Sequence, residues 1–264
     1  MESLQCDGTP LVIFKDREVQ LFSDLRGPSV TYPFDADRSA LATIAPRGDN
    51  LRLTRFKQWL SNVFCFRINP YGISGRADSE DLFPKLQLDN LASWYRHLIQ
   101  SDQRQNFELL KSLRSVMDDF KFLELQPVGE NVRVMIAEFG VDGAYTKYLL
   151  NELSEGQRCL LCLYTILHFL IEKGATVFID EPDNFISLRE IQPWLMAASD
   201  AVDEASSQLI LISHHPEILD QWAPSFGMRF FREKGGITRA KSFVATEEGM
   251  ALPPSELIAR GWIS

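Results

Sequence analysis

The chain contains 264 residues, and 45% of them are hydrophobic, which is enough to build a sizeable core in one large domain or two small ones. Its 36 acidic and 27 basic side chains give a net charge of −9, which opposes a nonspecific grip on nucleic-acid phosphates by the chain as a whole. A role with nucleic acid would therefore need a local basic patch or a partner's surface. No apolar run reaches the ~20 residues of a membrane span, and the N-terminal residues lack the basic start and apolar core of a signal peptide, so we expect a cytoplasmic protein without membrane contact.

The first part of the chain, residues 1–68, has the pattern of short strands followed by helices. Residues 10–34 alternate β-rich runs with turn signals, which predicts an antiparallel meander. Two helical patterns and one strand pattern follow, at residues 35–45, 51–63 and 64–68. Asp35 and Asp37 are both candidates for the N-cap of the first helix. We expect this part to combine an antiparallel sheet with helices.

The middle part, residues 69–120, combines a loop with a helical pair. Residues 69–85 are rich in Gly, Pro and charged side chains, which indicates an exposed loop. From Asp89 to Asp119 the apolar residues recur at helical spacing, with a break near residues 100–105. We expect a small helical insertion or lobe here.

The last part, residues 121–264, changes from antiparallel to alternating strands and helices. It opens with a hairpin pattern over residues 120–139 and a second turn at residues 140–145. A helix of about 17 residues is expected after Glu155. The remaining predicted elements are an apolar strand, an amphipathic helix, a second apolar strand, a hairpin turning at Gly235 and Gly236, and a short helix, within residues 175–182, 187–200, 207–217, 228–244 and 253–260.

Two wholly apolar strands separated by a helix are typical of a parallel sheet covered on both faces. The sequence therefore predicts an α/β fold: a mixed sheet with parallel core strands flanked by helices, joined to the N-terminal antiparallel β meander and a helical insertion.

The four cysteines are too few and too scattered to indicate a disulfide framework. Cys159 and Cys162 form a C-x-x-C, but no second pair and no nearby His at ligand spacing completes a zinc site. We interpret them as buried helix thiols.

Asp180 and Glu181 directly follow the first apolar strand, so both carboxylates lie at the carboxyl end of a buried strand. Ligands of open α/β sheets bind at that edge. One carboxylate there can hold Mg²⁺, and a second can orient or deprotonate the attacking water in phosphoryl transfer. Asp180 is the metal candidate and Glu181 the general-base candidate. The alternative is two solvated loop acids that happen to follow a strand.

Ser213, His214 and His215 repeat this arrangement after the second apolar strand. A neutral imidazole at that edge can hydrogen-bond a terminal phosphate or its attacking water. Adjacent side chains on a continuing strand point in opposite directions, so at most one of the two histidines is expected to face the site. A structural histidine is the alternative for either.

Residues 153–157, LSEGQ, stand where the long apolar helix begins. Gly156 permits a close backbone approach, Ser154 offers a hydroxyl, and the free N–H groups of a helix start attract anions. The alternative is an ordinary capping box, with Ser154 as N-cap and Gln157 three positions later.

Taken in this order and with these separations, LSEGQ plus helix, a strand ending in DEP, and a strand ending in SHHP resemble the C-terminal half of an ABC-type ATPase head. The likeness is to the soluble branch that contains the SMC, RecF and predicted AAA-type ATP-binding proteins. It is strongest over residues 149–220 and weaker in the flanking segments NLASWYRHL and PPSELIARGW. The resemblance implies an ABC-type P-loop NTPase fold.

The resemblance also implies roles for individual residues. Ser and Gly of the family's signature motif contact the γ-phosphate of ATP held by an opposing subunit, and the matching residues here are Leu153, Ser154, Glu155, Gly156 and Gln157. Residues 177–180 match the Walker B strand, with Asp180 on Mg²⁺, and Glu181 matches the catalytic glutamate. Asp183 to Ser187 occupy the place of the D-loop, so Asp183 and Ser187 are expected near the nucleotide. His214 matches the switch histidine, and ATP and Mg²⁺ are the implied cofactors.

A complete head of this kind needs a phosphate loop, G-x-x-x-x-G-K-[ST], and the sequence contains none. Gly72 and Gly75 lack the following Lys-Ser, and Lys147 has no suitable glycine before it. We therefore expect the chain to begin after the phosphate loop. Three explanations remain open: a C-terminal fragment of a longer ATPase, one half of a split ATPase, or a degenerate head that serves as a regulatory subunit.

The expected function is ATP hydrolysis coupled to ATP-driven dimerisation, with a second copy or a different ATPase head across the nucleotide. In this branch such cycles act on DNA or on a nuclease or toxin partner, in DNA repair or anti-phage defence. The alternative is a non-catalytic interaction subunit that keeps the fold. The presence of both DE and SHHP argues against this alternative, because a site that no longer catalyses a reaction has no physical need for these residues.

Overall fold

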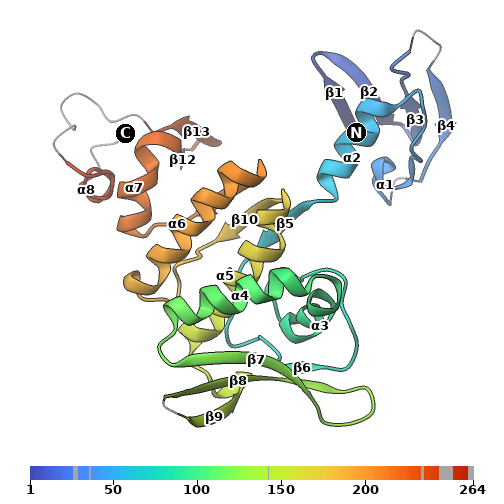
Figure 1. Ribbon diagram of the computed structural model, residues 1–264. Helices are drawn as coiled ribbons and strands as arrows, with labels where there is room; N and C mark the ends of the chain where they lie inside the picture. The colour runs from blue at the N-terminus through green and yellow to red at the C-terminus, as the bar shows by residue number, and fades with distance from the viewer. Residues whose placement is uncertain (26–28, 36, 142, 233–234, 244–251, 261–264) are drawn as a thin grey trace. The chain divides into compact units, whose positions relative to one another are not determined.

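The computed structural model describes residues 1–25, 29–35, 37–141, 143–232, 235–243 and 252–260 (Figure 1). By their internal contacts, the residues fall into two compact units, 1–63 and 64–264. Each unit has a hydrophobic cluster of its own. The boundary between the units falls at the start of strand β5 (Val63–Phe66).

The first unit is built on a four-stranded antiparallel sheet whose strands follow one another in chain order. The strands are β1 (Glu2–Cys6), β2 (Thr9–Lys15), β3 (Glu18–Leu21) and β4 (Val30–Pro33). The turns after β1 and β2 each have two central residues with positive φ, a conformation that matches the twist of paired strands: Asp7, Gly8, Asp16 and Arg17. The predicted meander is confirmed, with β1 as an additional strand.

Two helices pack on this sheet, α1 (Ala40–Thr43) and α2 (Leu51–Leu60). The N-cap of α1 is Ser39, whose side chain accepts a hydrogen bond from the Leu41 N–H at 3.3 Å. The predicted caps Asp35 and Asp37 are therefore wrong. Helical backbone begins only at Ala40, and Ser39 is the polar residue directly before it.

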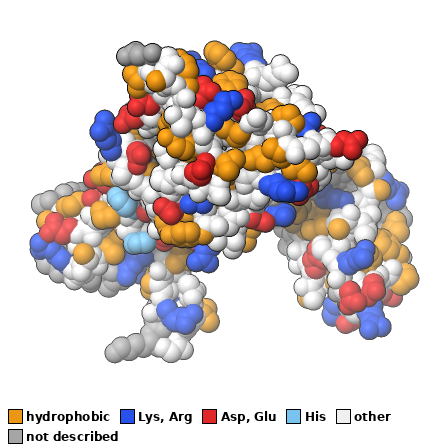
Figure 2. Space-filling view, turned by 90° about the horizontal axis from the view of Figure 1, so that it is seen from below, with side chains coloured by type: hydrophobic (Ala, Val, Ile, Leu, Met, Phe, Trp, Pro, Cys, Tyr) orange, Lys and Arg blue, Asp and Glu red, His pale blue; other side chains and the backbone are white. Residues whose placement is uncertain are grey.

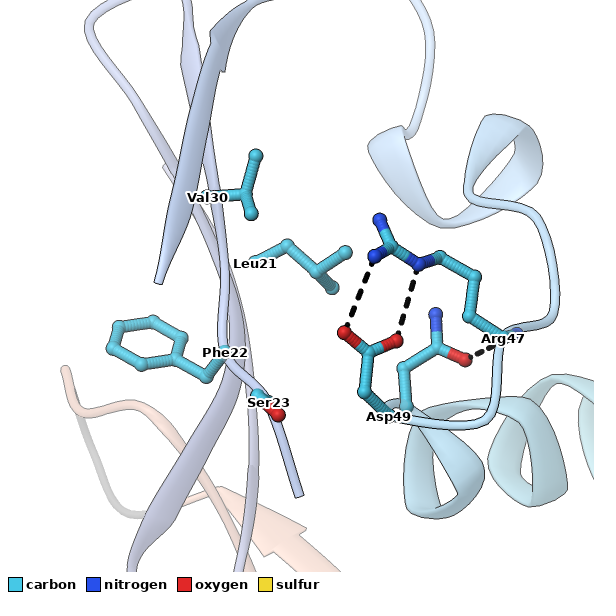
Figure 3. Close-up of a pocket in the computed structure, with 7 residues that line it drawn as sticks. Leu21, Phe22, Ser23, Val30, Arg47 and Asp49 are labelled. Carbon is cyan, nitrogen blue, oxygen red and sulfur yellow. Dashed lines mark hydrogen bonds and ion pairs between the residues drawn. The ribbon is translucent and has the colours of Figure 1, made fainter. Parts of the chain in front are cut away.

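A small pocket of the first unit lies between the end of β3 and the segment before α2 (Figure 3). The Arg47 Nε lies 3.1 Å from Asp49 Oδ1, and the Arg47 backbone N–H donates to Asn50 Oδ1 at 2.8 Å. Arg47 is therefore bonded to both Asp49 and Asn50 within this pocket. None of the predicted site residues lines this pocket.

The second unit contains the predicted parallel strands. β10 (Thr176–Asp180) lies between β5 and β11 (Gln208–Ile212), and β10 and β11 are parallel with Asp180 opposite Ile212. The predicted α/β class with parallel core strands is confirmed. Alternate residues Val177 and Ile179 are fully buried on one face. The opposite face is partly covered, with Thr176 4% and Ile212 54% exposed.

Helices α5 (Glu155–Phe169) and α6 (Leu188–Ala205) pack against each other next to this sheet. The Trp194 Nε1–H of α6 donates to the Leu163 carbonyl of α5 at 2.9 Å. Cys159 and Cys162 are 2% and 0% exposed, as predicted for buried helix thiols, and burial raises the pKa of the Cys159 thiol to about 12. Within the described ranges, no three His, Cys, Asp or Glu side chains form a metal-binding group.

A second antiparallel sheet completes the unit, with β8 (Arg133–Val141) paired to β6 (Arg76–Ala77), β7 (Phe120–Pro127) and β9 (Ala144–Leu149). The predicted hairpin of β7 and β8 is confirmed, and residue 142 of the second turn lies outside the described residues. The loop predicted at 69–85 is partly wrong, because Ala77 is fully buried in β6. The Met135 N–H donates to the Gly75 carbonyl at 2.7 Å and holds this segment to the sheet.

Helices α3 (Leu91–Ser101) and α4 (Gln103–Val116) form the predicted helical pair. The helical conformation is interrupted at Asp102. The side chain of Asp102 accepts a hydrogen bond from the Gln105 N–H and caps α4. Figure 1 shows both helices above the β7-β8 sheet, and their buried residues belong to the same hydrophobic cluster as α5. The domain boundaries at 68/69 and 120/121 remain a prediction.

The C-terminal elements are α7 (Pro216–Phe226), β12 (Met228–Arg232), β13 (Thr238–Ser242) and α8 (Pro254–Ala259), and two short 3₁₀ helices, Leu150–Glu152 and Ile171–Lys173, flank α5. β12 and β13 form the predicted hairpin, and α8 is the predicted last helix. The Ser255 N–H and hydroxyl both donate to the Asp220 carboxylate, which attaches α8 to α7. No helix in the described residues is long and apolar enough to cross a membrane.

Candidate functional site

Asp180, the last residue of β10, lies beside an arginine from the neighbouring strand. Arg67 directly follows β5, and its Nε lies 3.6 Å from Asp180 Oδ2. The Arg67 backbone is fixed by an N–H bond to the Leu86 carbonyl at 2.8 Å, whereas its side chain is 74% exposed. An exposed ion pair at this distance contributes little stability. Asp180 therefore remains accessible to a stronger cationic ligand.

Glu181 and His214 meet where β10 and β11 end. The Glu181 N–H donates to the Ile212 carbonyl at 2.7 Å, which holds the residue against β11. His214 Nδ1 lies 2.9 Å from Glu181 Oε1 and 2.8 Å from Oε2. Oε2 is buried and is in ion-pair contact with His214 Nδ1 without the geometry of a hydrogen bond. The carboxylate thus keeps unused acceptor capacity.

The hydrogen bond to Glu181 raises the pKa of His214 above its ordinary value of 6.5, and the negative charge of Glu181 acts in the same direction. The His214 side chain is 80% exposed. Figure 2 shows histidine side chains in pale blue at the surface, with carboxylates in red nearby. The pair is therefore open to a solute or to a partner surface.

His215 has a different role. It is the N-cap of α7, and its Nδ1 accepts a hydrogen bond from the Glu217 N–H at 3.3 Å. The structure thus brings His214, and not His215, to Glu181, which agrees with the residue-by-residue resemblance.

Asp183 and Ser213 connect the loop after β10 to the loop after β11. The Ser213 hydroxyl donates to Asp183 Oδ1 at 2.6 Å and accepts a hydrogen bond from the His215 N–H at 2.9 Å. Asp183 is only 8% exposed. Its carboxylate is therefore engaged inside the protein, and its predicted place near a nucleotide remains a prediction.

Ser187, the other residue predicted in this loop, begins helix α6. Its hydroxyl donates to Glu190 Oε2 at 2.5 Å, and its N–H donates to the same oxygen at 3.2 Å. A contact of Ser187 with nucleotide also remains a prediction.

The LSEGQ segment forms the start of α5. Ser154 is the N-cap: its Oγ accepts a hydrogen bond from the Gln157 N–H at 3.2 Å, and the Gln157 side chain accepts one from the Ser154 N–H at 3.0 Å. The capping box is therefore present. Leu153 is buried in the core, whereas Ser154 is exposed and Glu155 partly exposed. The cap and a phosphate contact are compatible, because the hydroxyl group is at the surface.

Gly156 lies against the loop that follows β10. A Cβ at this position would approach the Phe185 carbonyl oxygen to 2.9 Å. Phe185 itself has a φ of 70°, and its ring meets the Tyr71 ring edge-on at a centroid distance of 5.7 Å. The Arg158 guanidinium donates to the Pro70 carbonyl at 2.7 Å. The start of α5, the loop after β10 and the segment after β5 thus form one contact network.

The sequence did not identify Arg67 or Tyr71 as parts of this site, and it included Phe185 only within the range Asp183–Ser187. Arg67 is the fourth residue of the strand predicted at residues 64–68. A cation near the end of a strand, when a neighbouring strand ends in acidic residues, is the signal that could have identified it. Tyr71 gave no comparable signal, because its position depends on the path of the loop after β5.

These residues fit a magnesium–phosphate site better than a closed metal centre. Mg²⁺ is commonly held by one or two carboxylates together with substrate phosphates and water. Asp180 and Glu181 supply the carboxylates, and the described residues contain no third side chain to close a protein-only site. Asp180 would hold the ion, while the Glu181 carboxylate is held by His214.

Comparisons with known proteins show which proteins this chain is similar to. Residues 96–220 match the family described as "AAA domain, putative AbiEii toxin, Type IV TA system". ATP-binding cassette sub-family F member 2 from Mus musculus is 29% identical over 94 residues, and the Bos taurus protein is 28% identical over 94 residues. Each match covers 36% of this chain and 14% of the relative, so the chain spans about one seventh of these relatives.

A solved structure described as "Structural biochemistry of ATP-driven dimerization and DNA stimulated activation of SMC ATPases" is 14% identical, with a TM-score of 0.42, and the match covers 64% of this chain and 98% of that one. The family match spans LSEGQ, Asp180, Glu181 and His214. Over these residues the chain is therefore similar to the AAA-domain family and, in part, to the ATP-binding cassette relatives.

We predict that the His214 ring titrates above pH 6.5 and that Glu181→Gln lowers its pKa toward 6.5, because the amide removes the negative charge. A raised folded-state pKa stabilises the protein below the unfolded value of about 6.5, and this contribution is lost as the pH rises through the higher value. Histidine NMR titration measures the shift, with His214→Gln used to assign the signal. An unchanged His214 pKa in Glu181→Gln would contradict the contact.

We also predict that Gly156→Ala destabilises the protein by about 1–3 kcal/mol, the usual cost of overpacking. In an unobstructed helix the same change would stabilise by up to ~1 kcal/mol. Gly129→Ala, in the connection between β7 and β8, is the control at an unobstructed position, since its nearest neighbour would be Val132 Cβ at 4.0 Å. Urea unfolding measures the stability of both variants. Equal midpoints would contradict the prediction, because they would show that the loop containing Phe185 moves aside without an energetic cost.

Proposed function

We propose that this chain is the part of an ABC-type ATPase head that activates the attacking water and presents a signature motif to a partner. The reaction is hydrolysis of ATP to ADP and phosphate. The observation that carries the proposal is the contact of Glu181 with His214 at the ends of two parallel strands, beside Asp180. A carboxylate and an imidazole in this position form a base and a phosphate-binding group.

In this proposal Glu181 orients a water molecule and accepts its proton as the water oxygen attacks the terminal phosphorus. His214 fixes the Glu181 carboxylate through Nδ1, and its exposed ring is free to bind a phosphate oxygen. Mg²⁺ held by Asp180 would neutralise charge on the phosphates. The bond from the terminal phosphorus to the bridging oxygen breaks, and ADP leaves with that oxygen.

Ser154 and Gly156 act toward a nucleotide held elsewhere. Ser154 is exposed at the N-terminus of α5, and the first N–H groups of the helix attract a negatively charged phosphate. We propose that the phosphate loop missing from this sequence is supplied by additional sequence or by another polypeptide. The partner is a second copy or a different ATPase head, which contacts these residues across the nucleotide.

The biological role that we propose is control of a toxin or nuclease, or maintenance of DNA, by ATP-driven association. Support comes from the description of the matching family, which names a toxin system. A cytoplasmic location fits both roles. The alternative is a non-catalytic regulatory subunit, which the lack of G-x-x-x-x-G-K-[ST] in the sequence favours.

We predict that the chain alone binds Mg-ATP weakly and does not hydrolyse it, and that hydrolysis appears when a phosphate-loop polypeptide is added. Glu181→Gln should abolish turnover while nucleotide stays bound, because the amide cannot accept the proton. Calorimetry and phosphate release measure the two steps. If the chain alone bound Mg-ATP at micromolar concentration and hydrolysed it, the proposal that it lacks a phosphate-binding loop would be refuted. Turnover by Glu181→Gln would refute the assignment of Glu181 as the general base. No turnover in any mixture would favour the regulatory alternative.

The role of Ser154 is tested by two substitutions that separate capping from phosphate contact. Ser154→Ala should lower stability by ~1 kcal/mol through loss of the cap, whereas Ser154→Asn keeps a good cap. We predict that both variants lose ATP-dependent association with the phosphate-loop partner, measured by light scattering. Normal association of Ser154→Asn would mean that Ser154 serves only the helix.

A further inference from the structure

Strand β11 forms an open edge of the sheet of β5, β10 and β11. The strand order is β11-β10-β5, so β10 has a neighbour on both sides and the other two are edge strands. The chain that follows β5 is bonded to a further segment, because the Arg67 and Asn69 N–H groups donate to the Leu86 and Gln87 carbonyls at 2.8 and 3.4 Å. In the part of the chain that the structure describes, no strand pairs with the outer side of β11.

The hydrogen bonds of β11 identify the backbone groups at this edge. Bonds on the β10 side are made by the Gln208 N–H at 3.2 Å and by the Ile212 carbonyl at 2.7 Å. In a parallel pair, alternate residues of a strand direct their N–H and C=O groups to the neighbouring strand. Gln208, Ile210 and Ile212 therefore face β10, and the N–H and C=O groups of Leu209 and Leu211 point to the outer side. Among the described residues these outward groups have no hydrogen-bond partner.

The composition of β11 is that of an interior strand. Its five residues, QLILI, include no charged residue and no Pro, whereas edge strands of soluble proteins are usually protected by charges, Pro or bulges. Every residue of β11 is at least partly exposed, with Ile212 54% exposed, whereas Val177 and Ile179 of β10 are fully buried. Parallel strands normally lie in the interior of a protein. An interior type of strand therefore stands at an edge.

The candidate site indicates which strand fits this edge. Asp180, Glu181 and His214 lie at the carboxyl ends of β10 and β11. A phosphate loop connects the carboxyl end of a strand to a helix. A strand added parallel to β11 would lie about 4.8 Å from it and would place its following loop at the same end of the sheet. An antiparallel strand would place the loop at the opposite end.

We propose that β11 pairs in parallel with the strand that precedes the phosphate loop of a separate partner polypeptide. The outward N–H and C=O groups of Leu209 and Leu211 bond this strand, which turns β11 into an interior strand. The inference rests on the proposed function and specifies how the phosphate loop joins the site. A second copy of this chain could cover the apolar edge but would bring no phosphate loop, since the sequence contains none.

The first test follows amide hydrogen exchange of the full chain by NMR, without nucleotide. The probe is a synthetic peptide of about 35 residues with a strand rich in Val and Ile, the loop G-x-x-x-x-G-K-S and a helix. In the free chain, the Leu209 and Leu211 amides should exchange faster than the Ile210 and Ile212 amides, which are bonded to β10. Saturation with the peptide should slow exchange at Leu209 and Leu211 at least about tenfold.

The second test compares two substitutions of one residue, with binding of the fluorescein-labelled peptide followed by anisotropy. Leu211→Pro removes the outward N–H, whereas the matched control Leu211→Ala removes the same side chain and keeps the N–H. We predict that Leu211→Pro binds the peptide about tenfold more weakly than Leu211→Ala, because a bond to the added strand is lost. Circular dichroism verifies that both variants retain the fold.

Three results would overturn the strand pairing. They are unprotected Leu209 and Leu211 amides at saturating peptide, equal affinities of the two variants, and protection in the free chain that rises with protein concentration, since a second copy would then cover the edge. Phosphate release from Mg-ATP is measured separately. Protection without phosphate release would support the pairing and refute only the proposed reaction, whereas phosphate release without protection would refute only the pairing.

Discussion

The burial of α5 is the constraint on which the rest of the site depends. Every residue from Arg158 to Phe169 is buried, and polar groups along the helix are tied to three other segments through Pro70, Ser112 and Trp194. A helix held in this way cannot shift along its axis without breaking several contacts. Its first turn, which is not enclosed, therefore presents Ser154 at a fixed position. Sites on rigid elements keep their geometry better than sites on loops.

Strain accumulates in the loop that faces this helix start. Glu181 and Phe185 both have positive φ, 52° and 70°, which is uncommon for residues other than glycine and costs about 1–3 kcal/mol each. The bond from Ser213 to Asp183 and the Glu181 N–H bond to β11 hold the loop in this conformation. Gly156 makes room for the Phe185 carbonyl. The absence of a side chain at Gly156 therefore accommodates the loop after β10, in addition to any ligand that binds at the start of α5.

The sequence allowed the main elements to be predicted because their signals are local. Apolar strands next to acidic residues predicted β10 and its edge, and the Ser154–Gln157 spacing predicted the cap. The two apolar strands predicted that Glu181 and His214 lie at the same edge of the sheet, whereas their direct contact is seen only in the structure. Arg67 and Tyr71 were missed because their contacts join segments more than 100 residues apart, which no local pattern specifies. The buried strand at Ala77 was hidden for a similar reason: two residues pair with β8 within a polar segment.

Each of the two carboxylates at the sheet edge contacts a basic side chain, and the two contacts differ in strength. This difference suits a magnesium–phosphate site. Arg67 lies 3.6 Å from Asp180 and is largely exposed, whereas His214 lies within 3 Å of Glu181. A divalent cation approaching Asp180 competes with the weaker of the two pairs. In the proposed mechanism the Glu181–His214 pair would stay intact, so binding of the ion would leave the proposed base in place. The two neighbouring acids can therefore carry out different tasks because β5 and β11 give each of them a different partner.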